Sequence, residues 1–269
     1  FQTATFRFRA LQDSFGYDYT RLQNPTVEEL ERTLAMLENG THALALSSGM
    51  AAVMCAFSLL KRGDHLISSD DIYGGTYEIA KTELIDRGVE TTFVDLSDFE
   101  LFKKSIKENT KMIFIESPTN PTMKVADITE ICKVAKEKGI IVVVDNTLLT
   151  PYYQKPLDLG ADIVIHSGTK YLEGHNDTMA GFVITNKEEY FTPMRAFLTY
   201  QGACLAPLNA WLTLRGIKTL EVRMQRHNEN ALKVAEFLQN HPKVTKVYYT
   251  GLKDHKDYAT TMKQSTGFG

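Results

Sequence analysis

Short apolar runs alternate with helix-like segments along most of the chain, and this pattern predicts β-strands separated by helices. The apolar runs that predict strands are residues 43–46, 65–68, 91–96, 111–116, 140–144, 161–165 and 181–184. The segments that predict helices between them are residues 50–60, 77–87, 100–106 and 128–138. Repeated strand–helix–strand units with short connections indicate an α/β fold with a mostly parallel sheet and helices on both faces.

A further helix is predicted to begin near residue 26. Thr26 is a suitable N-cap, and Glu29 follows three residues later, as in a capping box. Leu30 and Leu34 would share one apolar face of the helix, and Gly40 would end it.

The chain is predicted to have three parts. Residues 1–25 are polar and irregular, which indicates an N-terminal arm. Residues 26–211 hold the alternating strands and helices and are predicted to form the large domain. A long helical stretch then leads to a further predicted strand at residues 244–249, so residues 212–269 are expected to be the start of a C-terminal α+β domain.

The composition is that of an ordinary globular protein. Apolar residues make up 43% and charged residues 23% of the 269 residues, which excludes a disordered or fibrous chain. A formal net charge of −3 argues against a general nucleic-acid or anionic-membrane surface. The longest apolar run, residues 140–144, is too short to span a bilayer.

The cysteine and histidine positions predict no metal centre. Cys55, Cys132 and Cys204 lie far apart and form no CxxC pair, so neither a disulfide framework nor a thiolate zinc site is expected. No two histidines stand at helical metal-ligand spacing. Unpaired cysteines favour a reduced, cytoplasmic setting.

The loop after the first predicted strand is a candidate anion site. In open parallel sheets, ligands bind at the carboxyl ends of the strands. Ser48, Gly49 and Met50 lie at such an end and open an apolar helix, whose free backbone N–H groups would attract a phosphate. A plain N-cap is the alternative. The sequence contains no GxGxxG and no Walker A motif.

Two ionisable residues follow neighbouring predicted strands. Asp145 comes directly after residues 140–144, and its carboxylate would be either a turn cap or the counter-ion of a positively charged ligand atom. Lys170 follows residues 161–165 in the segment Ser167-Gly-Thr-Lys, either as a surface lysine or as a reactive amine. An amine, a carboxylate, hydroxyl groups and a helix N-terminus are together what pyridoxal phosphate requires, so this combination favours that cofactor.

Seven motifs resemble those of the Cys/Met-metabolism family of pyridoxal-phosphate enzymes. They are YTRLQNPT (19–26), SSGMAA (47–52), DIYGGTY (71–77), ESPTNPT (116–122), VVVDNT (142–147), HSGTKYLEGHND (166–177) and LRGIKTLEVRMQRH (214–227). They span nearly the whole chain in the family's order. The resemblance implies the type I fold of pyridoxal-phosphate enzymes, which is like that of aspartate aminotransferase.

The resemblance also implies a role for each matching residue. Lys170 would form the Schiff base, Asp145 would pair with the pyridinium nitrogen, and Tyr73 would stack on the ring and take part in proton transfer. The other residues implied to bind the cofactor are Ser48, Gly49, Met50, Asn120, Thr147, Ser167 and Thr169. Tyr19 and Arg21 would reach the phosphate of a neighbouring subunit, which implies a homodimer with shared active sites, usually paired into a homotetramer.

Two reactions fit the resemblance. One is a C–S lyase that eliminates at Cβ or Cγ of cystathionine or a related sulfur amino acid, and this is the reading we favour. The other is a γ-replacement transferase that acts on an O-acylhomoserine, such as a cystathionine γ-synthase or an O-acetylhomoserine sulfhydrylase. Methionine γ-lyases typically carry cysteine where this chain has Gly75, which argues against that activity.

A catalytically inactive subunit or fragment is a third hypothesis. The chain begins at Phe1 rather than methionine and stops at Gly269, so both ends are expected to be cut. In the family, the arginine that binds the substrate carboxylate belongs to the C-terminal domain, and it is expected beyond Gly269.

Overall fold

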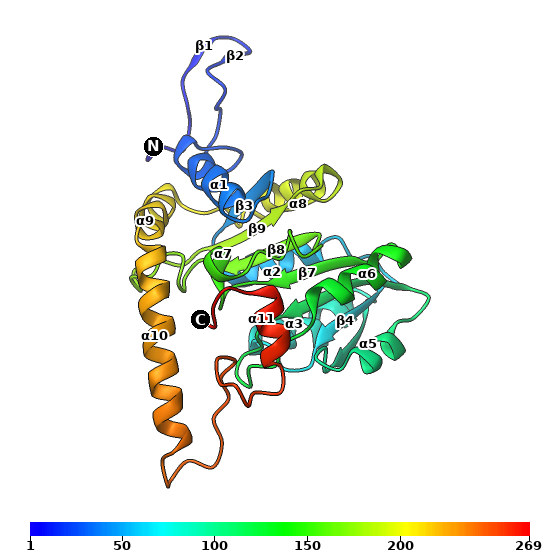
Figure 1. The fold of residues 1–269 in the computed structure, drawn as a ribbon. Helices are drawn as coiled ribbons and strands as arrows, with labels where there is room; N and C mark the ends of the chain where they lie inside the picture. Colours follow the sequence, from blue (N-terminus) through cyan, green and yellow to red (C-terminus); the bar gives the residue numbers. More distant parts are fainter. The chain divides into compact units, whose positions relative to one another are not determined.

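A computed structural model describes all residues from 1 to 269 (Figure 1). The strands are β1 (Phe8–Ala10), β2 (Asp13–Ser14), β3 (His42–Leu46), β4 (His65–Ser69), β5 (Glu90–Val94), β6 (Thr110–Glu116), β7 (Ile141–Asp145), β8 (Ile163–Ser167) and β9 (Gly181–Thr185). The helices are α1 (Pro25–Leu37), α2 (Gly49–Phe57), α3 (Gly74–Lys81), α4 (Glu83–Asp86), α5 (Phe99–Ser105), α6 (Ile128–Lys138), α7 (Thr150–Tyr153), α8 (Glu188–Gln201), α9 (Pro207–Ile217), α10 (Leu220–Gln239) and α11 (Tyr258–Gln264). None of the helices is both long enough and apolar enough to cross a membrane.

The sheet has seven strands in the order β3-β9-β8-β7-β6-β4-β5. The pairs β4–β5, β4–β6 and β6–β7 are parallel, whereas β3 and β9 are antiparallel. This arrangement confirms the predicted α/β class with a mostly parallel sheet. Parallel neighbours need a crossover connection, which explains why helices separate the strands along the sequence.

The chain folds as two compact units, which are described separately below. The first unit comprises residues 1–59 and 165–219, and the second comprises residues 60–164 and 220–269. The division into an arm, a large domain and a C-terminal domain stays a prediction.

The first unit is built around β3 and β9. These strands pair from His42 opposite Thr185 to Leu46 opposite Gly181. Helices α1 and α8 pack on β3, and α2 packs on β9. A Cβ at Gly181 would lie 1.9 Å from the carbonyl oxygen of Ser48, so only glycine lets the chain after β3 pass this close to the start of β9.

The start of α1 differs from the prediction. Asn24, not Thr26, is the N-cap, and its side chain accepts a hydrogen bond from the Thr26 amide at 3.0 Å. Pro25 occupies the first helical turn, where its missing N–H costs nothing, and this moves the helix start ahead of Thr26. Glu29 pairs with Arg32 at 2.6 Å, so the expected capping box is wrong.

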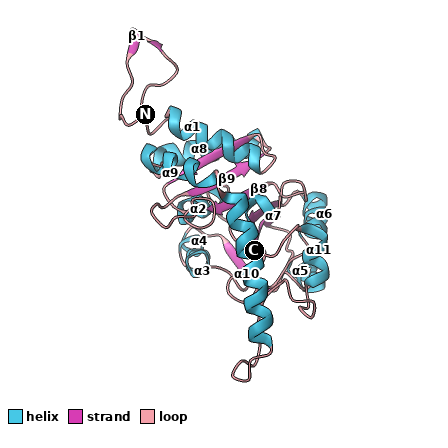
Figure 2. Ribbon diagram, turned by 60° about the vertical axis from the view of Figure 1, so that its left-hand side comes forward, coloured by secondary structure: helices cyan, strands magenta, loops and turns pink.

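The second unit has its core at β4, β6 and β7. Ile67, Ile113, Ile115, Val142 and Val144 come from these strands and are nearly inaccessible to solvent. Helices α5 and α6 cover this face of the strands (Figure 2). Each such side chain contributes roughly 1.5–3 kcal/mol when it leaves water.

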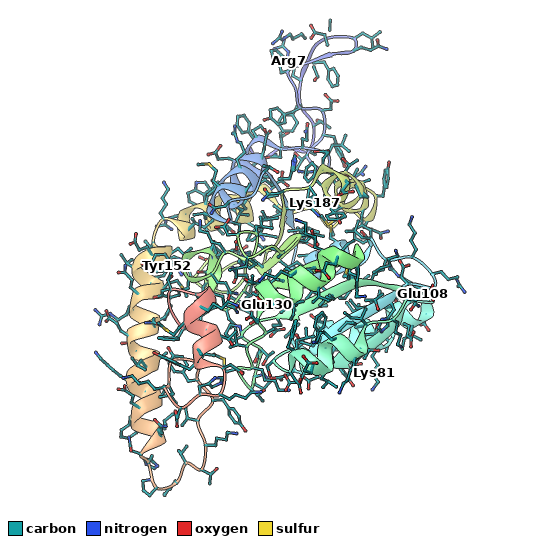
Figure 3. All side chains as sticks on the ribbon, turned by 45° about the vertical axis from the view of Figure 1, so that its right-hand side comes forward. Arg7, Lys81, Glu108, Glu130, Tyr152 and Lys187 are labelled. Atoms are coloured by element: carbon teal, nitrogen blue, oxygen red, sulfur yellow. The ribbon has the colours of Figure 1, made fainter.

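Charged side chains of the second unit lie on its surface. Lys81 at the end of α3 and Glu108 before β6 are both exposed (Figure 3). Glu130 on α6 pairs with Lys133 on the solvent side of that helix (Figure 3). This pattern agrees with the ordinary globular composition.

Three further expectations are wrong in detail. Residues 77–87 form two helices, α3 and α4, because the backbone breaks at Thr82. The long helical stretch predicted after residue 211 is interrupted at residues 218–219, between α9 and α10. Residues 244–249 form no strand, since no other segment pairs with them, and Val247 and Tyr249 pack near α10 instead.

The N-terminal arm is more regular than expected. β1 and β2 form an antiparallel hairpin that extends from the body of the first unit (Figure 1). Gln12, in the turn between them, has a φ of 63°, a left-handed conformation that turns commonly require.

Candidate functional site

The residues predicted to form a site fall into two groups, one in each unit. Ser48, Gly49, Met50, Ser167, Thr169 and Lys170 belong to the first unit, together with Tyr19 and Arg21. Tyr73, Asn120, Asp145 and Thr147 belong to the second.

The start of α2 provides hydrogen-bond donors for an anion. Ser48 is the N-cap, and its hydroxyl accepts from the Ala51 amide at 3.1 Å. The amides of Gly49 and Met50 lie in the first turn and have no acceptor within the helix. They therefore point their N–H groups out of the positive end of the helix dipole.

Ser167 lies directly against this helix start. A Cβ at Gly49 would be 2.9 Å from the Cβ and 3.0 Å from the Oγ of Ser167. No residue larger than glycine fits this position without displacing the serine. The structure thus joins the end of β8 to the first turn of α2.

Thr169 is fixed to the start of β9. Its Oγ1 accepts from the Ala180 amide at 3.2 Å, and the Gly168 amide donates to the Ala180 carbonyl at 2.9 Å. Because Gly181 is packed against Ser48, these bonds also keep Thr169 beside the start of α2. Two hydroxyls and two helix amides therefore gather in one place.

Lys170 follows in the same turn. Its amide donates to the Ser167 carbonyl at 3.3 Å, and its carbonyl accepts from the Gly174 amide at 2.8 Å. The backbone is held at both ends of this turn, while the residue is exposed. An exposed amine on a fixed backbone is available to a ligand.

A buried hydrogen bond supports the end of β8. His166, the residue before Ser167, approaches Glu38 at the C-terminal end of α1, with 2.5 Å between Nε2 and Oε1. Both side chains are about 1% exposed. This pair ties the strand that leads to Ser167 and Lys170 to the rest of the first unit.

The group in the second unit is arranged around Glu116, which the sequence analysis did not assign. Its Oε2 accepts from the Tyr73 amide and its Oε1 from the Asn120 amide, each at 2.9 Å. Glu116 also lies directly opposite Asp145 in the pairing of β6 and β7. A carboxylate after the apolar run at residues 112–115 is the same signal that singled out Asp145.

Asp145 and Tyr73 are both accessible to a ligand. The Oδ1 of Asp145 accepts from the Thr147 amide at 3.0 Å, and the residue is half-buried. Tyr73 is 53% exposed although its amide is bound. The structure therefore brings Tyr73, Asn120, Asp145 and Thr147 together at the carboxyl ends of parallel strands.

Electrostatics make Glu116 an unusual acid. Burial and the neighbouring Asp145 carboxylate raise the pKa of Glu116 to about 8, with a smaller contribution from Asp71. The bonds from the Tyr73 and Asn120 amides act in the opposite direction. The Asp145 carboxylate beside this second acid is a place where a cation would be stabilised.

We expect the cofactor-free chain to lose stability as the pH rises from about 4.5 to about 8. In this range folded Glu116 keeps a proton that the same residue in the unfolded chain has released. The folded state therefore binds more protons, and the free energy of unfolding falls as the pH rises toward the folded pKa. The effect on the free energy of unfolding should be on the order of a few kcal/mol. Urea unfolding across this range should show a weaker pH dependence for Glu116→Gln, and equal slopes for both proteins would contradict the assignment.

Tyr19 and Arg21 are placed apart from the other predicted residues. The Arg21 Nη1 donates to the Thr199 carbonyl in the last turn of α8 at 2.7 Å. Its guanidinium carbon lies 5.4 Å from the centre of the Tyr19 ring, which is 40% exposed. Neither side chain hydrogen-bonds to Ser48 or Thr169 within the chain.

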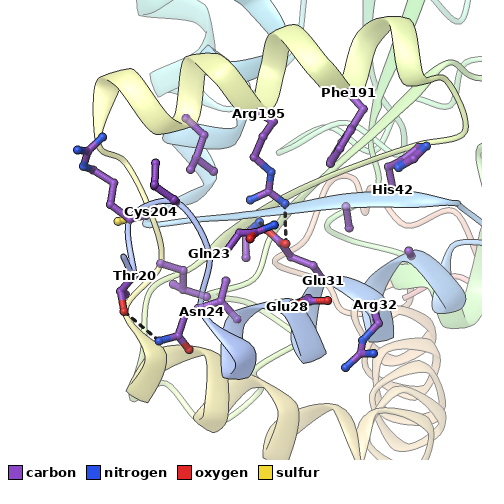
Figure 4. A pocket seen from close by; sticks show the side chains of 18 of the residues that line it. Thr20, Gln23, Asn24, Glu28, Glu31, Arg32, His42, Phe191, Arg195 and Cys204 are labelled. Carbon is purple, nitrogen blue, oxygen red and sulfur yellow. Dashed lines mark hydrogen bonds and ion pairs between the residues drawn. The ribbon is translucent and has the colours of Figure 1, made fainter. Parts of the chain in front are cut away.

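A separate cavity of about 270 Å³ lies in the first unit among α1, β3 and α8 (Figure 4). Arg195 and Glu31 approach each other across it, with 2.7 Å between Nη2 and Oε2. The other Glu31 oxygen accepts from the Ala45 amide at 2.9 Å. These bonds join the three elements, so the pair has a structural role.

Known proteins resemble this chain over its full length. The family described as "Cys/Met metabolism PLP-dependent enzyme" matches residues 1–269. A probable cystathionine gamma-synthase of Herpetosiphon aurantiacus is 43% identical over 269 residues, which are all of this chain and 84% of that protein. A cystathionine gamma-lyase of Bacillus subtilis is 44% identical over the same length, which is 71% of that protein.

Solved structures agree with these relatives. The crystal structure of metB from Corynebacterium glutamicum superposes with a TM-score of 0.98 at 44% identity. The superposition includes all of this chain and 70% of the chain in the crystal structure. The resemblance drawn from the sequence motifs is confirmed, and the chain belongs to the family of pyridoxal-phosphate-dependent enzymes of cysteine and methionine metabolism.

Proposed function

We propose that this chain attaches pyridoxal phosphate to Lys170 and eliminates a sulfur-containing group from cystathionine or a related sulfur amino acid. The observation that carries the proposal is the start of α2, where helix amides without an acceptor in the helix lie against Ser167, in the same short segment as Thr169 and Lys170. The family supplies the cofactor. The proposal adds which residues of this chain bind the cofactor and which reaction they carry out.

The residues present fit the cofactor. Gly49 has no side chain, and its contact with Ser167 leaves no room for one, which suits close approach of a phosphate to the helix amides. The hydroxyls of Ser167 and Thr169 would add donors, and Lys170 would bind the aldehyde carbon. In the second group, Asp145 would face the ring nitrogen, because its carboxylate stands beside a second acid and a cation there would relieve the repulsion.

Each residue would then have a defined part in the chemistry. When bound, the cofactor withdraws electrons from the α-carbon of an amino-acid substrate. Asp145 would hold a proton on the ring nitrogen. The amine of Lys170, released when substrate binds, would remove the proton from the substrate α-carbon and transfer protons near the leaving group. Tyr73 would stack on the ring and take part in proton transfer, with Asn120 beside it.

A γ-replacement transferase is the second candidate, because relatives of similar identity are named for both reactions. Lyase and synthase differ in what happens after the first proton is removed. Release of pyruvate or 2-oxobutanoate from cystathionine would support the lyase. Formation of cystathionine from an O-acylhomoserine and cysteine would support the transferase, and an inactive protein in both assays would leave the inactive-subunit hypothesis.

The proposal includes a shared site in a homodimer, further paired into a homotetramer. Tyr19 and Arg21 belong to the arm region and make no hydrogen bond to the helix-start residues of their own chain. A planar guanidinium suits a phosphate dianion, so Arg21 is proposed to serve a second copy.

We also propose a reduced, cytoplasmic setting for the protein. Cys55, Cys132 and Cys204 are free thiols. Burial raises the pKa of Cys55 and of Cys132 to about 12, which keeps both thiols protonated. Buried protonated thiols are unreactive and need no oxidising compartment.

Arg21→Ala is expected to weaken cofactor binding by about 1.5–3 kcal/mol, the contribution of a hydrogen bond to a charged group. Mixing Arg21→Ala with Lys170→Ala subunits should restore activity in part. One of the two sites of each mixed dimer then has an intact Lys170 from one copy and an intact Arg21 from the other.

The control mixes Lys170→Ala with the double variant Arg21→Ala/Lys170→Ala, which leaves no intact site. Subunit exchange is verified by mass spectrometry of the intact dimers. If the first mixture stays as inactive as this control, Arg21 does not serve a neighbouring copy.

A further inference from the structure

We propose that Glu116 is a positioning residue, which acts on the reaction by holding Tyr73 and Asn120 in place. This inference rests on the proposed function, because it assigns to those two residues a part in binding the cofactor. We call the arrangement of Glu116 with the amides of Tyr73 and Asn120 the Glu116 clamp.

The clamp joins two loops that are far apart in the sequence. Tyr73 follows β4 and precedes α3, while Asn120 follows β6. Each oxygen of the carboxylate accepts one amide hydrogen, at 2.9 Å in both cases. Glu116 is only 6% exposed, so water cannot replace these bonds if the carboxylate is removed.

A second carboxylate supports the same two loops. Asp71 accepts from the Thr119 hydroxyl at 2.6 Å and from the Thr122 amide at 3.0 Å. It also accepts from the Thr122 hydroxyl. The loop before Tyr73 and the loop around Asn120 are therefore tied together on both sides, and Glu116 is the tie nearest to the predicted site residues.

The chemistry of the clamp requires a side chain with two acceptor oxygens. Glutamine has one acceptor oxygen and one NH₂ donor, so in the same position it could accept only one of the two amides. The Glu116 carboxyl group also lies opposite Asp145, and burial together with the Asp145 carboxylate makes its ionisation unfavourable and raises its pKa. A residue needed only to fill space would avoid this cost, which indicates that two acceptor atoms are needed here.

The test compares Glu116→Gln with Asp162→Asn in the full chain. Asp162 is the matched control, because its Oδ2 accepts one backbone amide, that of Val142, at 2.8 Å near the other end of β7. Both variants change one carboxylate to an amide in the second unit. The first readout is hydrogen exchange of the Tyr73 and Asn120 amides in the cofactor-free chain, measured by NMR.

We expect Glu116→Gln to speed exchange at one or both of these amides by at least roughly tenfold, the scale of one lost hydrogen bond. Asp162→Asn should leave both amides unchanged. Unchanged exchange in Glu116→Gln would overturn the clamp. If Glu116→Gln does not fold, Glu116→Asp replaces it, since its shorter side chain cannot reach both amides.

The second readout is the affinity for pyridoxal phosphate, followed by the visible absorbance of the bound cofactor. We expect Glu116→Gln to weaken binding about tenfold in the parent chain and less than about twofold when Tyr73 and Asn120 are already alanine. An equal loss in both backgrounds would show that Glu116 does not act through these residues. Absence of binding by the parent chain would instead refute the proposed function, while the exchange measurement would still test the clamp.

Discussion

Lys170→Ala is expected to abolish covalent attachment of the cofactor and nearly all turnover. The turn from Ser167 to Gly174 holds the Lys170 backbone beside the start of α2, and no other lysine follows the hydroxyls of Ser167 and Thr169 in this turn. Under the proposed function, loss of the amine would remove both the attachment point and the base that takes the substrate α-proton. General acid–base catalysis alone contributes typically 10²–10⁴-fold, so the activity should fall at least that far.

The measurement is the visible absorbance of the loaded protein together with its steady-state activity. Lys187→Ala is the control, because Lys187 is an exposed lysine of the same unit that precedes α8. It should keep both the absorbance and the activity. A Lys170→Ala protein that still forms an adduct reducible by borohydride would show that another lysine carries the cofactor.

Asp145→Asn should impair catalysis far more than folding. An amide cannot hold a proton on the ring nitrogen, and loss of one partner of a partly buried ion pair costs about 3–5 kcal/mol. This corresponds to a fall in turnover of roughly 10²–10⁴-fold. Folding should change little, because the substitution also removes the negative charge that faces Glu116 across β6 and β7.

Turnover and the thermal unfolding midpoint are measured on the same preparations. Asp162→Asn, the same chemical change near the amino end of β7, should leave turnover within a few fold of the parent chain. If Asp145→Asn behaves in the same way, Asp145 only caps the turn at Thr147.

Local signals in the sequence were sufficient for much of the second unit. The continuous apolar run at residues 140–144 predicted a strand, and Val142, Val143 and Val144 are at most 1% exposed, as in a strand buried on both faces. The helix predicted at residues 128–138 has these bounds in the structure, and Gly139 ends it with a φ of 64°. In both cases the residue itself has the required preference, so no distant contact is needed for the prediction.

Features that depend on distant or competing partners were missed. Thr26 and Asn24 are both good caps, and only the place of Pro25 in the first turn decides between them. The run at residues 244–249 has the composition of a strand, but a strand also needs a neighbour with which to pair. Composition alone contains no information about that neighbour.

In the candidate site, too, residues with a local sequence signal were predicted, and a residue defined by its distant contacts was not. Asp145 and Lys170 were identified because each follows an apolar strand, a local pattern. Glu116 has the same pattern but was not assigned, because its bonds to the amides of Tyr73 and Asn120 are visible only in the folded chain. The role of Tyr73 came from the family resemblance and not from its spacing.

Identification of the lysine that carries the cofactor tests the central claim most directly. The chain is loaded with pyridoxal phosphate, reduced with borohydride to make the attachment permanent, digested and mapped by mass spectrometry. We expect the pyridoxyl group on the peptide that contains Lys170, at about one per chain, and on no other lysine at comparable occupancy. A modified peptide without Lys170, or no modified peptide at all, would contradict the account.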